Sequence, residues 1–319
     1  GVKKDDFAMV VGFPGSTDRY LSSWGVEQVI NQKAPMTVAI RERVLNIMDK
    51  DMDASEKVRL QYASKFSGSS NGWKFYIGQQ KGLKQLKVAN LKREIEAEFA
   101  KWSKNKPAYK EALNLMEEGI KEMSGNYPAD LYFREAIRRG NEIIRYSNSF
   151  RDLYDELAKK ENSPAIITKL TDELLAGVEG HFKDYNQPTD VKLLANSLNH
   201  FYTDIPKEFS PKYFVDLSAK YKGDFNKMAN DIFNRTLFGD PQKVKAFLNK
   251  PNHKTLSKDC FLTYFFSKAI LEIAFIQQTT LILKLQKLLY QKIALINSKH
   301  IFLINKITSS NSISPLYIA

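Results

Sequence analysis

The sequence predicts a mainly α-helical fold with a short β element near its N-terminus. Apolar residues recur at steps of three and four through most of the chain, which is the spacing of one helix face. Proline, serine and aspartate stand where several of these helices should begin. No alternation of apolar and polar residues, which would indicate strands, occurs between about residues 30 and 258.

The β element is predicted at residues 7–13, where a short apolar run ends at Pro14 and Gly15. A single strand cannot satisfy its own backbone N–H and C=O groups. We therefore expect its partner strands to lie outside this sequence. Residues 1–25 are interpreted as the remnant of a β domain.

The middle of the chain, residues 26–258, is predicted to form one helical domain. Pro35 lies in the first turn of one expected helix, and Ser55 is placed to cap the next. The clearest apolar stripe, which we expect to be buried, consists of Val88, Leu91, Ile95, Phe99 and Trp102. Short loops are expected at three proline-containing breaks: Asn126–Pro128, Asn186–Pro188 and Gly239–Pro241.

Residues 259–319 have a different composition from the rest of the chain. After Asp259 the sequence contains no Gly, Val, Arg, Met or Trp, and Ile and Leu fill about a third of the positions. We interpret this segment as an atypical tail, translated out of frame from AT-rich DNA. The alternative is a genuine hydrophobic pair of C-terminal helices. Its longest uncharged apolar runs are shorter than the ~18 residues of a membrane span.

The basic composition does not by itself indicate a nucleic-acid partner. Lys and Arg number 48 against 36 Asp and Glu, for a net charge of +12. Most of these charges alternate in sign at helical spacing, which is typical of a solvated helix face. We expect no nucleic acid and no membrane span. The single cysteine, Cys260, excludes an intrachain disulfide.

Two segments are more specific than the composition. The first runs from Met9 through Gly12-Phe-Pro-Gly15 to Leu21 and continues as Ser23-Trp-Gly-Val-Glu27. The second is Ser67-Gly-Ser-Ser-Asn-Gly-Trp-Lys74. In this order and spacing they closely resemble the bacterial dipeptidyl-peptidase 7 and 11 family, which are serine exopeptidases of the chymotrypsin clan. The resemblance extends more loosely to about residue 258, and the tail is not part of it.

The resemblance implies that this chain is a fragment. Such enzymes carry a double β-barrel with a large helical domain inserted between the barrels. Residues 1–25 resemble the end of the first barrel, and residues 26–258 resemble the inserted helical domain that caps the cleft. In this family the catalytic His and Asp lie upstream of the Gly-Phe-Pro-Gly segment and the nucleophilic Ser lies far downstream. We therefore expect this chain to contain none of the three.

Asn71 is the one binding residue that the resemblance suggests. Enzymes of this family recognise the free N-terminal ammonium of a peptide, and an Asn of the helical domain contributes to this recognition. An amide oxygen can accept hydrogen bonds from an ammonium without adding charge. A purely structural interpretation is that Asn71 caps a helix beginning at Gly72. The resemblance favours the binding role, and the two roles are compatible.

The chain shows no catalytic or metal-binding pattern of its own. His181, His200, His253 and His300 stand in contexts that identify none of them as a catalytic base. Paired Cys and His-x-x-x-His spacings are absent, so we expect no metal and no cofactor.

The sequence thus predicts a fragment of a serine dipeptidyl peptidase, a hydrolase that releases dipeptides from the N-termini of oligopeptides. The resemblance also implies a periplasmic or cell-surface location and a homodimer, although the sequence leaves the oligomeric state open. The alternative is a non-enzymatic basic helical module that acts as a binding protein or scaffold. Sensitivity of nucleic-acid binding to salt would favour that alternative.

Overall fold

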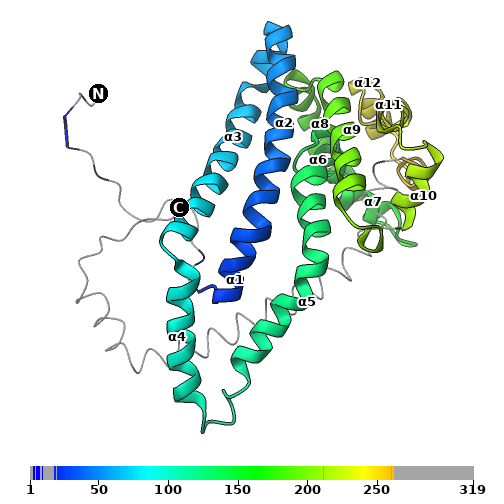
Figure 1. Ribbon diagram of the computed structural model, residues 1–319. Helices are drawn as coiled ribbons and strands as arrows, with labels where there is room; N and C mark the ends of the chain where they lie inside the picture. Colours follow the sequence, from blue (N-terminus) through cyan, green and yellow to red (C-terminus); the bar gives the residue numbers. More distant parts are fainter. Residues whose placement is uncertain are drawn as a thin grey trace.

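Three long helices lie side by side and form the frame of the domain (Figure 1). They are α2 (Ala34–Ala54), α3 (Glu56–Gln85) and α5 (Ala112–Tyr132). Helices α2 and α3 form a tight antiparallel hairpin because the single residue Ser55 between them is extended. As expected, the hydroxyl of Ser55 caps α3, accepting a hydrogen bond from the N–H of Val58 at 3.4 Å.

The structure is a computed structural model, and it describes residues 20–210, 212–259 and 261 together with residues 3, 5–7, 9 and 18. The other elements are α1 (Ser23–Gln28), η1 (Val29–Lys33), α4 (Val88–Ser103), η2 (Phe133–Arg138), α6 (Glu142–Asn148), α7 (Arg151–Leu157), α8 (Pro164–Lys183), α9 (Gln187–Asp204), η3 (Lys207–Phe209), α10 (Lys212–Lys220), α11 (Phe225–Arg235), α12 (Pro241–Asn249) and α13 (His253–Leu256). Segments η1 and η2 are π-helical and η3 is a 3₁₀ turn.

The predicted mainly helical fold is confirmed, and none of the residues just specified forms a strand. The strand predicted at residues 7–13 lies outside the described residues apart from Phe7 and Met9. The predicted tail likewise lies outside them, apart from Asp259 and Phe261. Both of these residues are buried, and Phe261 packs edge-on against Phe233.

The main hydrophobic core lies where α6 to α12 cluster beside the C-terminal half of α5 (Figure 1). Ile143, Leu153, Ile232 and Phe238 are fully buried there. The rings of Phe150 and Phe238 meet edge-to-face, with their centroids 4.9 Å apart. Burying each aliphatic or aromatic side chain contributes about 1.5–3 kcal/mol to folding, so this cluster fixes the body that supports the long helices.

Asp190 joins two helices of this core. Its carboxylate is fully buried and accepts hydrogen bonds from the N–H groups of Glu142 at 2.9 Å and Ile143 at 2.8 Å. The hydroxyl of Tyr185 donates to the same carboxylate at 3.2 Å. The N-cap residue of α6, Asn141, makes no side-chain cap, so a carboxylate from the first turn of α9 satisfies the free N–H groups of α6.

Arg41 joins the long hairpin to η2. Its guanidinium pairs with Glu135, with Nη2 and Oε2 2.8 Å apart, and its Nη1 donates to the carbonyl of Ser69 at 3.3 Å. The Arg41 side chain is only 8% exposed. It packs directly on Gly72 of α3, where an added Cβ would lie 2.2 Å from Nη1. Glycine at position 72 therefore provides the space that Arg41 occupies.

The loop predicted at Asn126–Pro128 is wrong, because α5 continues through it with Pro128 inside the helix. Proline has no N–H, which leaves the carbonyl four residues earlier without its helical partner. That carbonyl belongs to Ser124, and the side-chain Nε2 of Gln32 donates to it at 3.3 Å. A tertiary hydrogen bond thus compensates for the proline. The other two predicted breaks are confirmed as helix starts, capped by Asn186 and Asp240.

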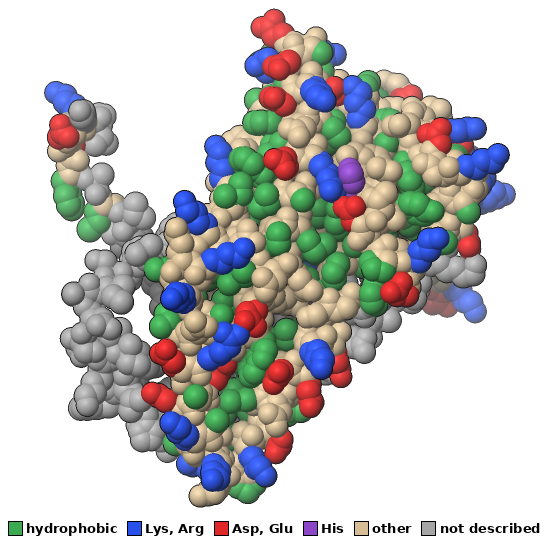
Figure 2. Space-filling view, viewed as in Figure 1, with side chains coloured by type: hydrophobic (Ala, Val, Ile, Leu, Met, Phe, Trp, Pro, Cys, Tyr) green, Lys and Arg blue, Asp and Glu red, His purple; other side chains and the backbone are tan. Residues whose placement is uncertain are grey.

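The apolar stripe predicted to be buried on α4 is only partly buried: Val88, Phe99 and Trp102 are half-buried, and the other two residues are exposed. Leu91 is 52% exposed and Ile95 is 54% exposed. Val88, at the start of the stripe, packs against the buried cluster of Val26, Val29 and Leu83. Helix α4 also contacts α1 through a polar residue, since Glu96 accepts hydrogen bonds from the N–H and hydroxyl of Ser23 at 2.7 and 2.6 Å. Figure 2 shows apolar side chains on the visible face over α4 and α5. The sequence correctly predicted a helix with an apolar face but could not show what covers that face.

A search of the helices in the described part of the chain finds none that combines the length and apolar character needed to cross a membrane.

Replacing Gly72 with alanine is expected to destabilise the domain. The new methyl group must displace the Arg41 guanidinium and weaken its charged hydrogen bonds to Glu135 and to the carbonyl of Ser69, which costs about 1.5–3 kcal/mol. The gain in helix propensity, about 1 kcal/mol, offsets only part of this. Urea denaturation of the Gly72→Ala variant should therefore show a net loss of about 0.5–2 kcal/mol.

Gly78→Ala is the matched control, because no atom lies within 4 Å of a Cβ built at that position of the same helix. This variant should be as stable as the parent chain or up to about 1 kcal/mol more stable. Equal effects of the two substitutions would contradict the proposed packing of Arg41 on Gly72.

The stability of the domain should also depend on pH through Asp190. Burial, together with the nearby charge of Glu142, raises the pKa of Asp190 to about 7, although its backbone hydrogen bonds oppose the shift. The folded state therefore holds a proton that the unfolded state releases near pH 4, and stability falls as pH rises from about 4 to about 7. The loss is on the order of 4 kcal/mol.

This dependence is measured by comparing unfolding free energies of the parent chain and Asp190→Asn between pH 4 and 7. The variant should be less stable than the parent chain at pH 4, because the NH2 group of Asn would face the N–H of Glu142 or of Ile143 and cannot accept its hydrogen bond. The difference between the two proteins should shrink as pH rises. A constant difference across this range would show that Asp190 does not titrate there.

Candidate functional site

The segment Ser67–Lys74 lies within α3, and Asn71 is in the middle of this helix. The interpretation of Asn71 as a helix cap is therefore wrong, because α3 begins at Glu56 and runs without interruption to Gln85. The Asn71 side chain is exposed and makes no hydrogen bond to another described residue. It is available to a ligand, and the rigid helix backbone fixes its position.

A cleft of about 710 Å³ opens beside this segment. Its walls come from α2, α3, η2 and the start of α6, so residues far apart in the sequence meet there. The residues that line it are Arg41, Val44, Met48, Lys65, Gly68, Ser69, Arg134, Glu135, Arg138, Arg139, Gly140, Glu142 and Arg145. Gly68 and Ser69 place the cleft directly next to the turn of α3 that carries Asn71.

The cleft is strongly basic. Six cationic side chains and two acidic ones are found among the described residues that line it. Some of this charge is neutralised locally, since Arg41 pairs with Glu135 at 2.8 Å and Lys65 pairs with Glu142 at 2.7 Å. A concave surface lined by one sign of charge concentrates the field within it. The arrangement therefore favours an anionic ligand.

Sequence reasoning missed the arginines of this cleft. It interpreted the basic residues as solvated helix faces. Arg134, Arg138 and Arg145 are separated by four and seven residues, a spacing that would align them along one face of a helix. That periodicity could have identified a basic stripe, but the cleft itself depends on the packing of α2 and α3 against η2.

His181 lies behind the cleft, in the aromatic core. Its ring stacks on Tyr146 with the centroids 3.7 Å apart and the planes 4° apart, and its Nε2 has no hydrogen-bond partner. Burial, and secondarily the charges of Lys65 and Arg145, lower the pKa of His181 to about 4. This histidine is a neutral packing residue at physiological pH. It is not placed to activate a nucleophile.

The other described histidines are also not part of a catalytic group. The Nδ1 of His200 lies 3.9 Å from Asp204 one helical turn away, and His253 packs against the ring of Tyr154. His300 lies outside the described residues. No cluster of His, Cys, Asp and Glu suited to a metal ion occurs in the described ranges.

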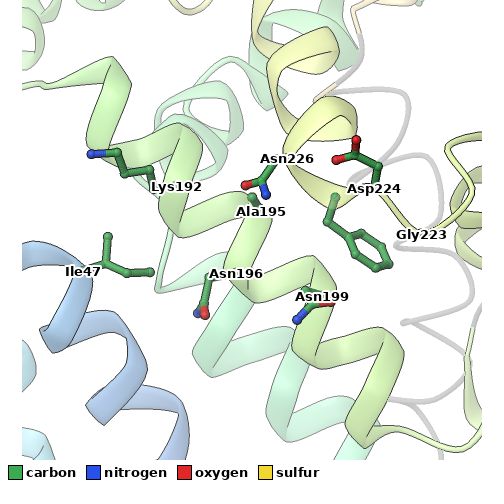
Figure 3. Close-up of a pocket in the computed structure, with 9 residues that line it drawn as sticks. Ile47, Lys192, Ala195, Asn196, Asn199, Gly223, Asp224 and Asn226 are labelled. Carbon is green, nitrogen blue, oxygen red and sulfur yellow. The ribbon is translucent and has the colours of Figure 1, made fainter.

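A second cavity, of about 440 Å³, lies between α2, α9 and the start of α11 (Figure 3). Asn196 and Asn199 face it from α9. Its charged groups already have structural roles, because Lys192 pairs with Asp51 at 2.6 Å and Asp224 caps α11. The basic cleft beside Asn71 is therefore the stronger candidate for a functional site.

Solved structures share the fold of this chain. The crystal structure of DPP11 from Porphyromonas endodontalis in complex with the dipeptide Arg-Glu matches with a TM-score of 0.65 and 21% sequence identity. The match covers 89% of this chain and 41% of that chain. The complex of the same enzyme with Arg-Asp also gives a TM-score of 0.65, at 20% identity.

Curated relatives are dipeptidyl peptidases. Dipeptidyl-peptidase 7 of Porphyromonas endodontalis is 34% identical over 266 residues, which are 81% of this chain and 31% of the relative. An Asp/Glu-specific dipeptidyl-peptidase of Flavobacterium psychrophilum is 29% identical and is covered to 36% of its length. The chain thus spans about a third of the length of these relatives.

The family model described as Peptidase S46 matches residues 1–284, so it extends past residue 258, where the resemblance was expected to end, into the first part of the predicted tail. This match and the curated relatives confirm the resemblance inferred from the segments around Gly12-Phe-Pro-Gly15 and Asn71, and the chain belongs to the peptidase S46 family.

Proposed function

We propose that this chain is part of a serine dipeptidyl peptidase that releases dipeptides from the N-termini of oligopeptides. Membership of the peptidase S46 family carries this proposal, and the dipeptidyl-peptidase names of its relatives support it. In the intact enzyme, substrate cleavage would proceed by acyl transfer through a Ser nucleophile. The catalytic His, Asp and Ser would lie outside this chain.

Within that enzyme, residues 26–258 would form the helical domain that caps the cleft, inserted between two β-barrels. The helical fold shared with DPP11 supports this assignment. Residues 1–25 would belong to the first barrel. The intact enzyme would act in the periplasm or at the cell surface and would form a homodimer, as the family resemblance implies.

Asn71 would bind the ammonium group of the substrate's first residue. Its exposed amide projects from the middle of α3 and makes no hydrogen bond to another described residue. The amide oxygen can therefore accept hydrogen bonds from the ammonium. A helical domain positioned over the cleft would also block longer N-terminal extensions, which would make the enzyme an exopeptidase.

The purified 319-residue chain is expected to have no peptidase activity, because the nucleophile and its base would be absent. Incubation with a hexapeptide followed by mass spectrometry should detect no released dipeptide above buffer alone. Dipeptide release that co-purifies with the chain and is abolished by Asn71→Ala would show that the chain holds a complete active site.

Ammonium recognition by Asn71 can be tested directly by NMR on chain labelled with ¹⁵N-asparagine. The side-chain amide signal of Asn71 is identified as the one absent from the spectrum of the Asn71→Ala variant. Titration with the amidated tripeptide Gln-Ala-Ala should shift this signal. The N-acetylated tripeptide, which lacks the ammonium, should cause no such shift.

Asn199→Ala is the matched control, since Asn199 is an amide of the second cavity. That variant should retain the response to Gln-Ala-Ala amide. If free and acetylated tripeptides shift the Asn71 signal equally, the amide does not recognise the ammonium and the proposed binding role is wrong.

A further inference from the structure

The basic cleft beside Asn71 contains arginines that the fold does not use. Arg138 and Arg145 are both exposed, both line the cleft, and neither pairs with an acid among the described residues. Arg41, in contrast, is committed to Glu135 and to the carbonyl of Ser69. Guanidinium groups bind carboxylates and other oxyanions through two parallel hydrogen bonds. Arg138 and Arg145 can therefore serve a ligand without loss of a structural contact.

The neighbourhood of the cleft is positively charged even after its internal ion pairs are counted. Arg139 approaches Glu135 only at 3.9 Å, and Glu135 is already shared with Arg41. The charges of Lys65 and Arg145 also lower the pKa of His181 behind the cleft, although burial is the larger cause. An anion that enters the cleft would thus meet a favourable potential.

The cleft and Asn71 belong to one continuous surface of α3. Gly68 lines the cleft, and Asn71 follows it by three residues, so the two are neighbours on the helix surface. A short peptide whose ammonium is held by Asn71 would extend beside the cleft. The anionic groups of an unmodified peptide are carboxylates, either on Asp and Glu side chains or at the C-terminus.

We propose that the cleft between α2, α3 and η2 binds a carboxylate group of the peptide, with Arg138 and Arg145 as its partners. This inference rests on the proposed function, because it takes a peptide at Asn71 as the ligand. It adds a selectivity for anionic peptides that is encoded in the helical domain itself. The carboxylate comes from an acidic side chain or from the peptide's C-terminus.

The test measures the affinity of the 319-residue chain for three tripeptides by NMR titration or calorimetry. Gln-Ala-Ala amide carries no carboxylate, Glu-Ala-Ala amide carries one on its side chain, and Gln-Ala-Ala acid carries one at its C-terminus. At least one of the two carboxylate peptides should bind about fivefold or more tightly than the neutral peptide. The carboxylate peptide whose affinity exceeds that of the neutral peptide identifies the source of the carboxylate.

The double variant Arg138→Gln/Arg145→Gln should lose this gain while still binding the neutral tripeptide. Lys110→Gln/Lys121→Gln is the control with the same change in charge, because these exposed lysines do not line the cleft and pair with no acid among the described residues. The control should retain the gain. Circular dichroism and thermal unfolding verify that both double variants are folded, as expected for exposed side chains.

Equal affinities of the three peptides would overturn the inference, and so would a gain that survives in Arg138→Gln/Arg145→Gln or is lost equally in the control. Absence of binding by every peptide would overturn it as well. Failure of the proposed function gives a different result. In that case free and acetylated peptides bind equally and Asn71→Ala has no effect, whatever the cleft arginines do.

Discussion

The buried guanidinium of Arg41 is the interaction on which the geometry of the site depends. Arg41 belongs to α2 and contacts Glu135 of η2 as well as the carbonyl of Ser69 and the Cα of Gly72 in α3. It therefore joins α2, α3 and η2 at one point. A charge buried to this degree is tolerated only when its partners are complete. The same contact sets the wall of the cleft and the position of the turn that carries Asn71. A glycine within a long helix, which would otherwise weaken that helix, is thereby explained.

Charge in this domain has two distinct roles. The buried side chains of Asp190 and Arg41 stabilise the fold, because each forms hydrogen bonds or an ion pair with residues of another helix. Arg138 and Arg145 of the cleft form no ion pair within the described residues and give the cleft an unbalanced positive charge. The whole chain carries a net charge of +12. Part of it is concentrated where the chain would meet a peptide.

The helical class, the cap at Ser55 and the family could be predicted from the sequence because each depends on local patterns or short motifs. Features that depend on contacts between residues far apart in the sequence could not be predicted. Pro128 indicated a break, yet Gln32 supplies the missing hydrogen bond and the helix continues. Leu91 and Ile95 indicated burial, yet the described part of the chain leaves about half of each side chain exposed. The candidate residue Asn71 was located by its motif, whereas the adjoining cleft required the packing of α2, α3 and η2.

The continuity of α3 has a mechanical consequence. At 1.5 Å per residue, its 30 residues form a rod roughly 45 Å long, with Asn71 near the midpoint. The flanking residues at which the backbone leaves the helical conformation are Ser55 and Lys87, the latter with φ of 49°. Because Asn71 lies at the centre of this continuous helix, a change in a nearby loop cannot bring its side-chain amide closer to a ligand. The amide moves only together with the entire helix, and rigid-body motions of this kind occur on the microsecond-to-millisecond timescale.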